Sequence, residues 1–282
     1  MTEAEAGAGA GDAIEYPPPH HLLRDLALEV EHRDHGRSVA WLPVVPALLG
    51  DTGRVRAGAL ATLVDVIGGG LAAQAAAPDW IATADLTLHV VGAVRDGVVE
   101  ADARVLRRGR TTVVIEVDLR HGRDVAGIAT MTFSVLPRRD TNPVISFGGG
   151  TPRVSFVLPG TGFDAPVLDE VGCTVVDAAA GVVDLPVTDY ARNSFGALQG
   201  GVVAMGIDAA AEAALRVACD APVTVTDLQV TYLALVRGTL RTTTEVLHAS
   251  PSFGSATVDV LDAGSEARRT TTARVVATRD DR

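Results

Sequence analysis

Apolar residues gather most densely between positions 58 and 77, where the sequence reads GALATLVDVIGGGLAAQAAA. A helix built from this segment is apolar on nearly every face, which predicts a helix inside the fold rather than on its surface. Asp65 is its only charged residue. Because a buried carboxylate loses much of its hydration, Asp65 is the first residue that requires an explanation.

Segments of strand character follow this helix. They read TADLTLHVVGAV, GVVEADARVLRRGR, TTVVIEVDLRHG and VAGIATMTFSVL, and they are rich in Val, Thr and Ile. Turn residues such as Asp96-Gly97 separate them, which predicts an antiparallel meander after one long helix. Ahead of the helix, residues 39–49 predict an edge strand, because proline, here Pro43, is poorly tolerated inside a sheet. Residues 20–35 are compatible with a short helix or with an entry strand.

The same order of elements occurs again in the second half of the chain. GALQGGVVAMGIDAAAEAALRVAC predicts a second long helix, and further Val- and Thr-rich segments follow it. The numbers of Asp65 and Asp208 differ by 143, and those of Asp85 and Asp227 differ by 142. A nearly constant offset predicts an internal duplication. The glycines at 68–70 are costly in a helix, and we expect them to permit close packing of the two central helices.

These patterns predict an α+β fold with two like domains. Residues 1–19 are expected to form a mobile tail, since they are rich in Ala, Gly and Glu and show no periodicity. The domains are predicted at 20–137 and 166–282. A linker rich in Gly, Pro and Thr is predicted between them at 138–165, where ISF and RVSFVL are short segments able to pair elsewhere.

Charge and composition narrow the function. The 282 residues carry a net charge of -11, which argues against a nucleic-acid partner and means that an anionic ligand needs a local basic patch. Two cysteines and seven scattered histidines predict neither a disulfide framework nor a metal site. Apolar runs are interrupted by Asp, Gly or Pro, and no segment resembles a signal peptide. We therefore expect a cytoplasmic protein without a membrane partner.

At GALATLVD and NSFGALQGGVVAMGID, each followed by a TADL or TVTDL strand, the sequence resembles the hotdog-fold acyl-CoA thioesterases of the phenylacetate-pathway type. The resemblance covers residues 22–136 and 167–278. It implies two tandem hotdog domains, a double hotdog, each with an antiparallel sheet wrapped around one long central helix. The family signature is an Asn, a His-Gly-Gly at the helix start and an acid nine residues after the His. The second half has Asn193, Gln199-Gly200-Gly201 and Asp208, so only the His is missing.

In the resembling family each site is composite, with the acid and a strand hydroxyl from one hotdog and the Asn and helix-start Gly from its partner. The halves are therefore matched crosswise. The resemblance implies one site made of Asp65, Thr83, Asn193, Gln199 and Gly200. A possible second site around Asp208 has Val225, Gly50, Arg56 and Ala57 in the matching places, so it lacks the hydroxyl, the Asn and the Gly. One working site per chain is predicted.

The chemistry of thioester hydrolysis fits these residue types. A half-buried carboxylate has a raised pKa and can act as general base or nucleophile. Backbone N–H groups at a helix N-terminus suit a developing oxyanion. The hairpin residues Arg107, Arg108 and Arg110 are placed by the resemblance near the phosphates of coenzyme A, although a solvated turn explains them equally well. No cofactor is expected beyond coenzyme A as part of the substrate, and the resemblance implies a homo-oligomer.

Two other functions stay open on the sequence alone. The missing His and the incomplete second site are compatible with a hotdog that binds acyl-CoA or another acyl ligand without turnover. A hotdog hydratase or dehydratase is a weaker alternative, because that chemistry requires a His near the helix start and neither helix segment contains one. Thioester hydrolysis is the preferred hypothesis.

Overall fold

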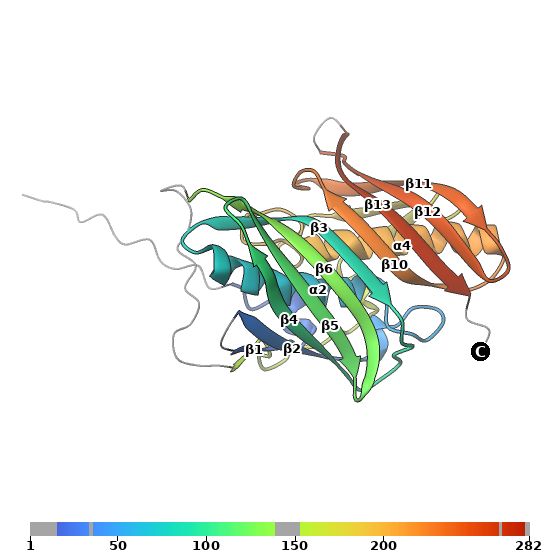
Figure 1. Ribbon diagram of the computed structural model, residues 1–282. Helices are drawn as coiled ribbons and strands as arrows, with labels where there is room; N and C mark the ends of the chain where they lie inside the picture. Colours follow the sequence, from blue (N-terminus) through green and yellow to red (C-terminus); the bar gives the residue numbers. More distant parts are fainter. Residues whose placement is uncertain (1–15, 34–35, 139–152, 265–266, 280–282) are drawn as a thin grey trace, which may run out of the picture.

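The described part of the chain forms two long helices and thirteen strands (Figure 1). The computed structural model describes residues 16–33, 36–138, 153–264 and 267–279. The long helices are α2 (Ala57–Ala76) and α4 (Gly200–Cys219), and short helices are α1 (Leu22–Asp25), α3 (Val167–Glu170) and the 3-10 turn η1 (Pro46–Leu48). The strands of the first half and the connection are β1 (Glu29–Arg33), β2 (Arg37–Pro43), β3 (Trp80–Val90), β4 (Val98–Arg108), β5 (Thr112–His121), β6 (Asp124–Leu136) and β7 (Arg153–Ser155). Those of the second half are β8 (Thr174–Asp177), β9 (Val182–Pro186), β10 (Val223–Tyr232), β11 (Thr239–Ala249), β12 (Phe253–Asp262) and β13 (Arg268–Arg279).

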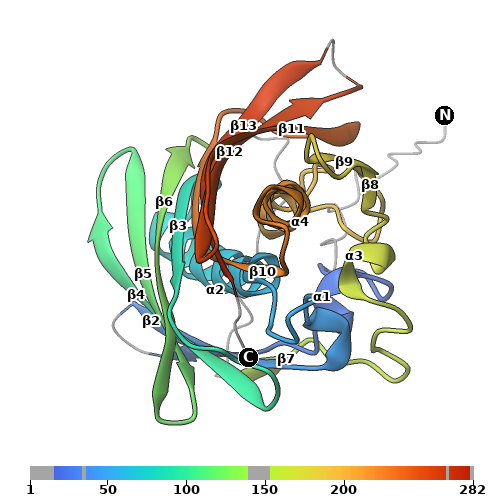
Figure 2. The same cartoon turned by 90° about the vertical axis from the view of Figure 1, so that its right-hand side faces the viewer.

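All of these strands join one antiparallel sheet. Their order is β7-β1-β2-β4-β5-β6-β3-β10-β13-β12-β11-β9-β8, so the strands of the two halves occupy its two ends and meet at β3 and β10. Figure 2 shows α4 inside the curve of the second-half strands, with α2 beside it against the strands of the first half. Each helix therefore buries its apolar surface against the strands of its own half.

The two halves are related by a pseudo-twofold axis at the β3–β10 junction. Thr87 pairs with Gln229, and the numbers of these two residues differ by the duplication offset of 142. One symmetric pair of side-chain contacts flanks them: Thr231 Oγ1 donates to Asp85 Oδ2 at 3.3 Å, and His89 Nδ1 lies 2.5 Å from Asp227 Oδ1. The axis passes between the two strands, so any site at one end of this pair has a counterpart at the other end.

Glycine permits the two central helices to approach closely at two symmetric points. A Cβ at Gly58 would lie 2.6 Å from Met205 Cα, and a Cβ at Gly201 would lie 2.4 Å from Thr62 Cα. Side chains at either position would push the helices apart. The expectation that the glycines at 68–70 serve this purpose is wrong, because a Cβ at Gly68 would lie 2.8 Å from the sulfur of Met131 on β6.

The N-terminal segments differ from two sequence expectations. Residues 39–41 are not at an edge, because they pair with β1 on one side and β4 on the other, whereas Leu42 and Pro43 pair with β4 alone. Pro43 is tolerated there because it is the last residue of the strand. Within the predicted segment 20–35, the described residues 20–33 form both suggested elements, α1 and then β1. From the predicted linker, β7 pairs with β1, whereas ISF lies outside the described residues, as does the predicted tail up to residue 15.

Helix α2 is long and apolar enough to cross a membrane by length and composition alone, contrary to the expectation from its interrupted sequence. Most of it is buried inside the fold. Its 20 residues span about 30 Å, a length that the surrounding strands match. Its apolar character is thus explained by packing.

Candidate functional site

The carboxylate of Asp65 bridges the two halves of the chain. It lies in the middle of α2 and is 8% exposed. Its Oδ1 accepts a hydrogen bond from Thr83 Oγ1 on β3 at 3.1 Å, and its Oδ2 accepts one from the backbone N–H of Gly201 on α4 at 3.0 Å. The structure therefore places the acid of the first half against the helix start of the second half.

Burial changes the acidity of this carboxyl group. It raises the pKa of Asp65 to about 6, and the hydrogen bonds from Gly201 and Thr83 oppose the rise by stabilising the ionised form. A carboxylate with this pKa is ionised at neutral pH and is still a better proton acceptor than an ordinary aspartate. It therefore suits general-base or nucleophilic chemistry.

Gly200 and Gln199 complete the surroundings of the acid. A Cβ at Gly200 would lie 3.0 Å from both carboxylate oxygens of Asp65, so a larger residue would press on the acid. Gln199 is the N-cap of α4 and is only 6% exposed, and its side chain forms no cap hydrogen bond. Its Oε1 is buried without a hydrogen-bond partner among the described residues. An unsatisfied buried amide costs about 1–3 kcal/mol, which a bound water or ligand would recover.

Asn193 has a different position from the other predicted site residues. Its Oδ1 accepts hydrogen bonds from the backbone N–H groups of Phe195 at 2.9 Å and Ala197 at 3.2 Å. The side chain thus shapes the loop that leads into α4. Phe195 in this loop packs edge-on against Trp80 of β3, with ring centroids 4.5 Å apart. The loop is held against the first half, and no hydrogen bond joins Asn193 to Asp65 within the described residues.

Sequence reasoning missed Tyr232 at this site. Its phenolic O–H donates to the backbone carbonyl of Gly200 at 2.9 Å, which fixes the first turn of α4. Burial, with the nearby carboxylates of Asp65 and Asp85, raises the pKa of Tyr232 well above its usual range. The signal available in the sequence was one aromatic residue with a polar end on an otherwise Val- and Thr-rich strand, which does not distinguish it from a core residue.

The symmetric position around Asp208 has different chemistry. Asp208 is also buried, and it accepts a hydrogen bond from the backbone of Gly58, the first-half counterpart of Gly201. Burial raises the pKa of Asp208, while the guanidinium of Arg56, 3.8 Å from Oδ2, opposes that rise. Arg56 stands where the first site has Gln199, and it also forms an ion pair with Glu212.

Three residues around Asp208 differ from their counterparts around Asp65 in ways that alter the chemistry of the site. Val225 replaces the hydroxyl of Thr83, and Ala57 replaces Gly200. Glu212 stands where the first half has Gly69, so an ion pair fills a place that is uncharged beside Asp65. The two positions share a buried acid and a helix start, but only the one at Asp65 has the hydroxyl and the glycine.

The three hairpin arginines are remote from the acid. Arg107 and Arg108 end β4, and Arg108 Nε donates to the carbonyl of Ala75, close to the C-terminal end of α2, at 3.0 Å. Asp65 lies ten residues earlier on that helix, about 15 Å away along its axis. Among the described residues, no group of three or more His, Cys, Asp or Glu side chains is arranged to hold a metal ion.

Comparison with solved structures shows the fold. A candidate thioesterase II from Thermobifida fusca YX is 18% identical, and the match covers 93% of this chain and 99% of that chain with a TM-score of 0.61. The tesB protein of Mycobacterium avium subs paratuberculosis is 14% identical over 92% of this chain and 97% of that chain, with a TM-score of 0.58. An acyl-ACP thioesterase from Bacteroides thetaiotaomicron is 12% identical over 86% and 98%, also at 0.58. Such similarities extend over both halves of the chain.

A protein-family model matches one segment of the chain. Residues 68–134, from the second half of α2 to β6, match the model of the acyl-CoA thioesterase N-terminal domain. The matched part of the chain therefore resembles a thioesterase domain. The matched residues lie in the first half of the chain, and the match supports thioester hydrolase activity. No curated protein matches the chain.

Proposed function

We propose that this protein hydrolyses acyl-CoA thioesters at one composite site, made of Asp65 and Thr83 from the first half and residues 199–201 from the second. The observation that carries the proposal is the hydrogen bond from Gly201 N–H to the buried carboxylate of Asp65. It brings the only acid of the apolar helix to the start of the other long helix. We further propose that residues 20–137 and 166–282 are two hotdog domains, joined by residues 138–165.

Asp65 acts as the proton acceptor in this reaction. As general base it takes a proton from water, and the resulting hydroxide attacks the thioester carbonyl carbon. Collapse of the tetrahedral intermediate breaks the C–S bond, and the thiolate of coenzyme A recovers the proton from Asp65. As nucleophile, the carboxylate would instead attack the carbonyl carbon, the C–S bond would break with release of the coenzyme A thiolate, and water would hydrolyse the resulting anhydride, giving one proton to the thiolate. The same residue is required by both routes.

The start of α4 stabilises the developing negative charge. The first N–H groups of a helix have no partner within it, and the helix dipole favours an anion there. Gly201 N–H is already bonded to Asp65, so Gly200 N–H is the backbone donor assigned to the oxyanion. The buried amide of Gln199 supplies a hydrogen bond to the attacking water or to the carbonyl. Asn193 acts at this site by shaping the loop, and Arg107, Arg108 and Arg110 remain a prediction for the phosphates of coenzyme A.

The experiment that tests this function is a hydrolysis assay over a panel of aliphatic and aryl acyl-CoA esters, with release of free thiol as the readout. We expect measurable turnover of at least one class of ester without added metal or cofactor. If acyl-CoA binds and no ester is hydrolysed, the protein is an acyl-ligand-binding hotdog instead. The same purified protein examined by size-exclusion chromatography with light scattering tests the predicted homo-oligomer.

The dependence of activity on pH follows from the acidity of Asp65. A general base must be ionised, so kcat/KM should fall about tenfold for each pH unit below about 6 and level off above pH 7. Thr83→Val removes a hydrogen bond that lowers this pKa, and its profile should shift to higher pH. Measurement is by initial rates between pH 4.5 and 8.5 at constant ionic strength. A flat profile across this range would exclude Asp65 as the titrating base.

A further inference from the structure

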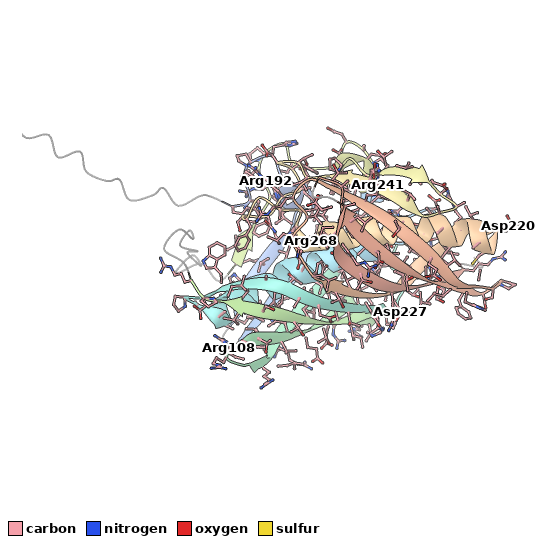
Figure 3. All side chains as sticks on the ribbon, turned by 90° about the horizontal axis from the view of Figure 1, so that it is seen from above. Arg108, Arg192, Asp220, Asp227, Arg241 and Arg268 are labelled. Carbon is pink, nitrogen blue, oxygen red and sulfur yellow. The ribbon has the colours of Figure 1, made fainter. Side chains whose placement is uncertain are left out.

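A cavity of about 280 Å³ lies where the loop after β10 meets the hairpin between β12 and β13. Its walls are Ala234, Leu235, Arg237, Asp262, Arg268 and Thr270. Arg268, labelled in Figure 3, is the first residue of β13. Pockets that enclose a whole drug-sized ligand span about 300–1,000 Å³, so this cavity suits one part of a larger ligand.

Two hydrogen bonds connect the end of β10 and the loop after it with the segment that begins α4. Arg237 Nη1 donates to the carbonyl of Phe195 at 3.2 Å, and Phe195 belongs to the loop that leads into α4. On the same strand end, Tyr232 lies two residues before Ala234 and bonds to the carbonyl of Gly200. A ligand with its reactive carbon at the start of α4 can therefore extend along the end of β10 to the cavity.

The backbone around Arg237 and Arg268 is held by hydrogen bonds, and their guanidinium groups are not neutralised by an ion pair within the described residues. The carboxylate of Asp262 is buried and accepts backbone hydrogen bonds from Arg237 at 2.8 Å, Gly238 at 3.1 Å and Gly264 at 3.1 Å. It thus fixes the backbone of both loops rather than neutralising a guanidinium. Neither Arg237 nor Arg268 forms an ion pair within the residues that the structure describes.

The pseudo-twofold axis provides an internal comparison. Arg95 corresponds to Arg237, and it contacts the carbonyl of Thr52, the first-half counterpart of Phe195. Arg268 opens β13 opposite Asp262, whereas the residue that opens β6 opposite His121 is Asp124. The residues in the matching places are therefore Arg95 and Asp124, and Arg54 lines a separate cavity at the end of β3. Arg237 and Arg268 both line the cavity on the side of the site that contains Asp65, Thr83 and Gly200.

We propose that Arg237 and Arg268 bind the phosphate groups of the coenzyme A part of the substrate. This inference rests on the proposed function and assigns the phosphates to the cavity rather than to the hairpin of Arg107, Arg108 and Arg110. Guanidinium groups match phosphate oxygens with paired hydrogen bonds. A chain with a net charge of -11 repels a polyanionic substrate, so a local pair of cations is needed to hold it.

The test compares one acyl-CoA with the matching S-acyl pantetheine, which has the same thioester but no phosphate. Arg268→Ala should raise KM for the acyl-CoA about tenfold, the size of one lost charge-assisted contact, while changing kcat/KM for the pantetheine ester less than twofold. Arg269→Ala is the matched control. It removes the same charge one residue away, where Arg269 forms an ion pair with Asp259 at 3.0 Å. Arg107→Ala combined with Arg110→Ala tests the hairpin.

Several outcomes would overturn the proposal. If Arg268→Ala and Arg269→Ala raise KM for acyl-CoA equally, the effect comes from the net charge of the protein and not from a phosphate site. If Arg268→Ala lowers kcat/KM equally for acyl-CoA and for the pantetheine ester, Arg268 does not act through phosphate. A loss selective for acyl-CoA in the Arg107 and Arg110 variant alone would place the phosphates at the hairpin. Calorimetry with free coenzyme A separates this inference from hydrolysis. If no ester turns over, about tenfold weaker binding of coenzyme A by Arg268→Ala still supports the cavity, and absent binding to the wild type rejects it.

Discussion

Asp65→Asn should lower kcat for acyl-CoA hydrolysis about a thousandfold, because the amide can neither accept the proton of water nor attack a carbonyl carbon. Asn preserves the size of the side chain and can still accept one of the two hydrogen bonds that Asp65 receives from Thr83 and Gly201. Measurement of kcat and KM separately should show the loss mainly in kcat, since the substrate is held by other groups.

The matched variant is Asp208→Asn, at the symmetric position on α4. Asp208 lacks a hydroxyl partner and has the guanidinium of Arg56 beside it, so we expect this variant to retain at least a third of the wild-type kcat. Equal losses in the two variants would refute the model of one working site. Partial loss in each, with complete loss in the double variant, would indicate two working sites.

Thermal unfolding distinguishes chemistry from stability in the Asp65 variant. The folded pKa of Asp65, about 6, lies above the ordinary value of 3.8, so the folded state binds this proton more tightly than the unfolded state. Stability from this group is therefore fully present below about pH 4 and is lost as pH rises through 6. At pH 7 the ionised carboxylate destabilises the fold, and Asp65→Asn should not lower the Tm there.

Gly200→Ala should lower kcat about a hundredfold without destabilising the protein. The new Cβ would lie 3.0 Å from both oxygens of Asp65, so the carboxylate must move away from Thr83 and from Gly201 N–H. Misplacement of a reacting group by a fraction of an ångström to about 1 Å has effects of this size. Alanine favours the helical conformation over glycine by as much as about 1 kcal/mol, so the Tm should stay constant or rise.

The symmetric residue provides the control for this glycine. Ala57 occupies the place of Gly200 at the start of α2, beside Asp208, and Ala57→Gly should leave turnover within a factor of about two. Both variants are compared by kcat and by thermal unfolding at the same pH. Activity of Gly200→Ala within threefold of the wild type would show that the carboxylate has room to move, and would remove the glycine from the site.

The sequence predicted the relation between the halves better than local details. A nearly constant offset in residue number, 142 or 143, identified which positions are equivalent, and the crossed matching directed Asp65 and Thr83 to the helix that begins at Gly200. Two features made this possible: a lone acid in an apolar helix, and glycines at a helix start. Neither a charged residue inside an apolar helix nor a pair of glycines at a helix start is favoured by packing or helix stability, so both features can be recognised from the sequence.

Other features depend on side-chain contacts that the sequence does not encode locally. Pro43 suggested an edge strand, but its position at the end of β2 leaves the ladder intact. The glycines at 68–70 suggested helix contact, whereas Gly58 and Gly201 provide it. Tyr232 and Arg237 gain their roles only from loops brought near them by the second half of the fold, and nothing in their immediate neighbours indicates this.

The pairing of β3 with β10 covers a strand edge in each half that would otherwise be exposed. Each of these strands has ten or more residues, and in an isolated half its outer side would present unpaired N–H and C=O groups. A long uncovered strand of this kind recruits other chains and promotes aggregation. Covalent fusion of the copies keeps the protecting partner at high local concentration. We therefore expect the proposed linker at residues 138–165 to keep β3 and β10 paired and to protect both strand edges from other chains.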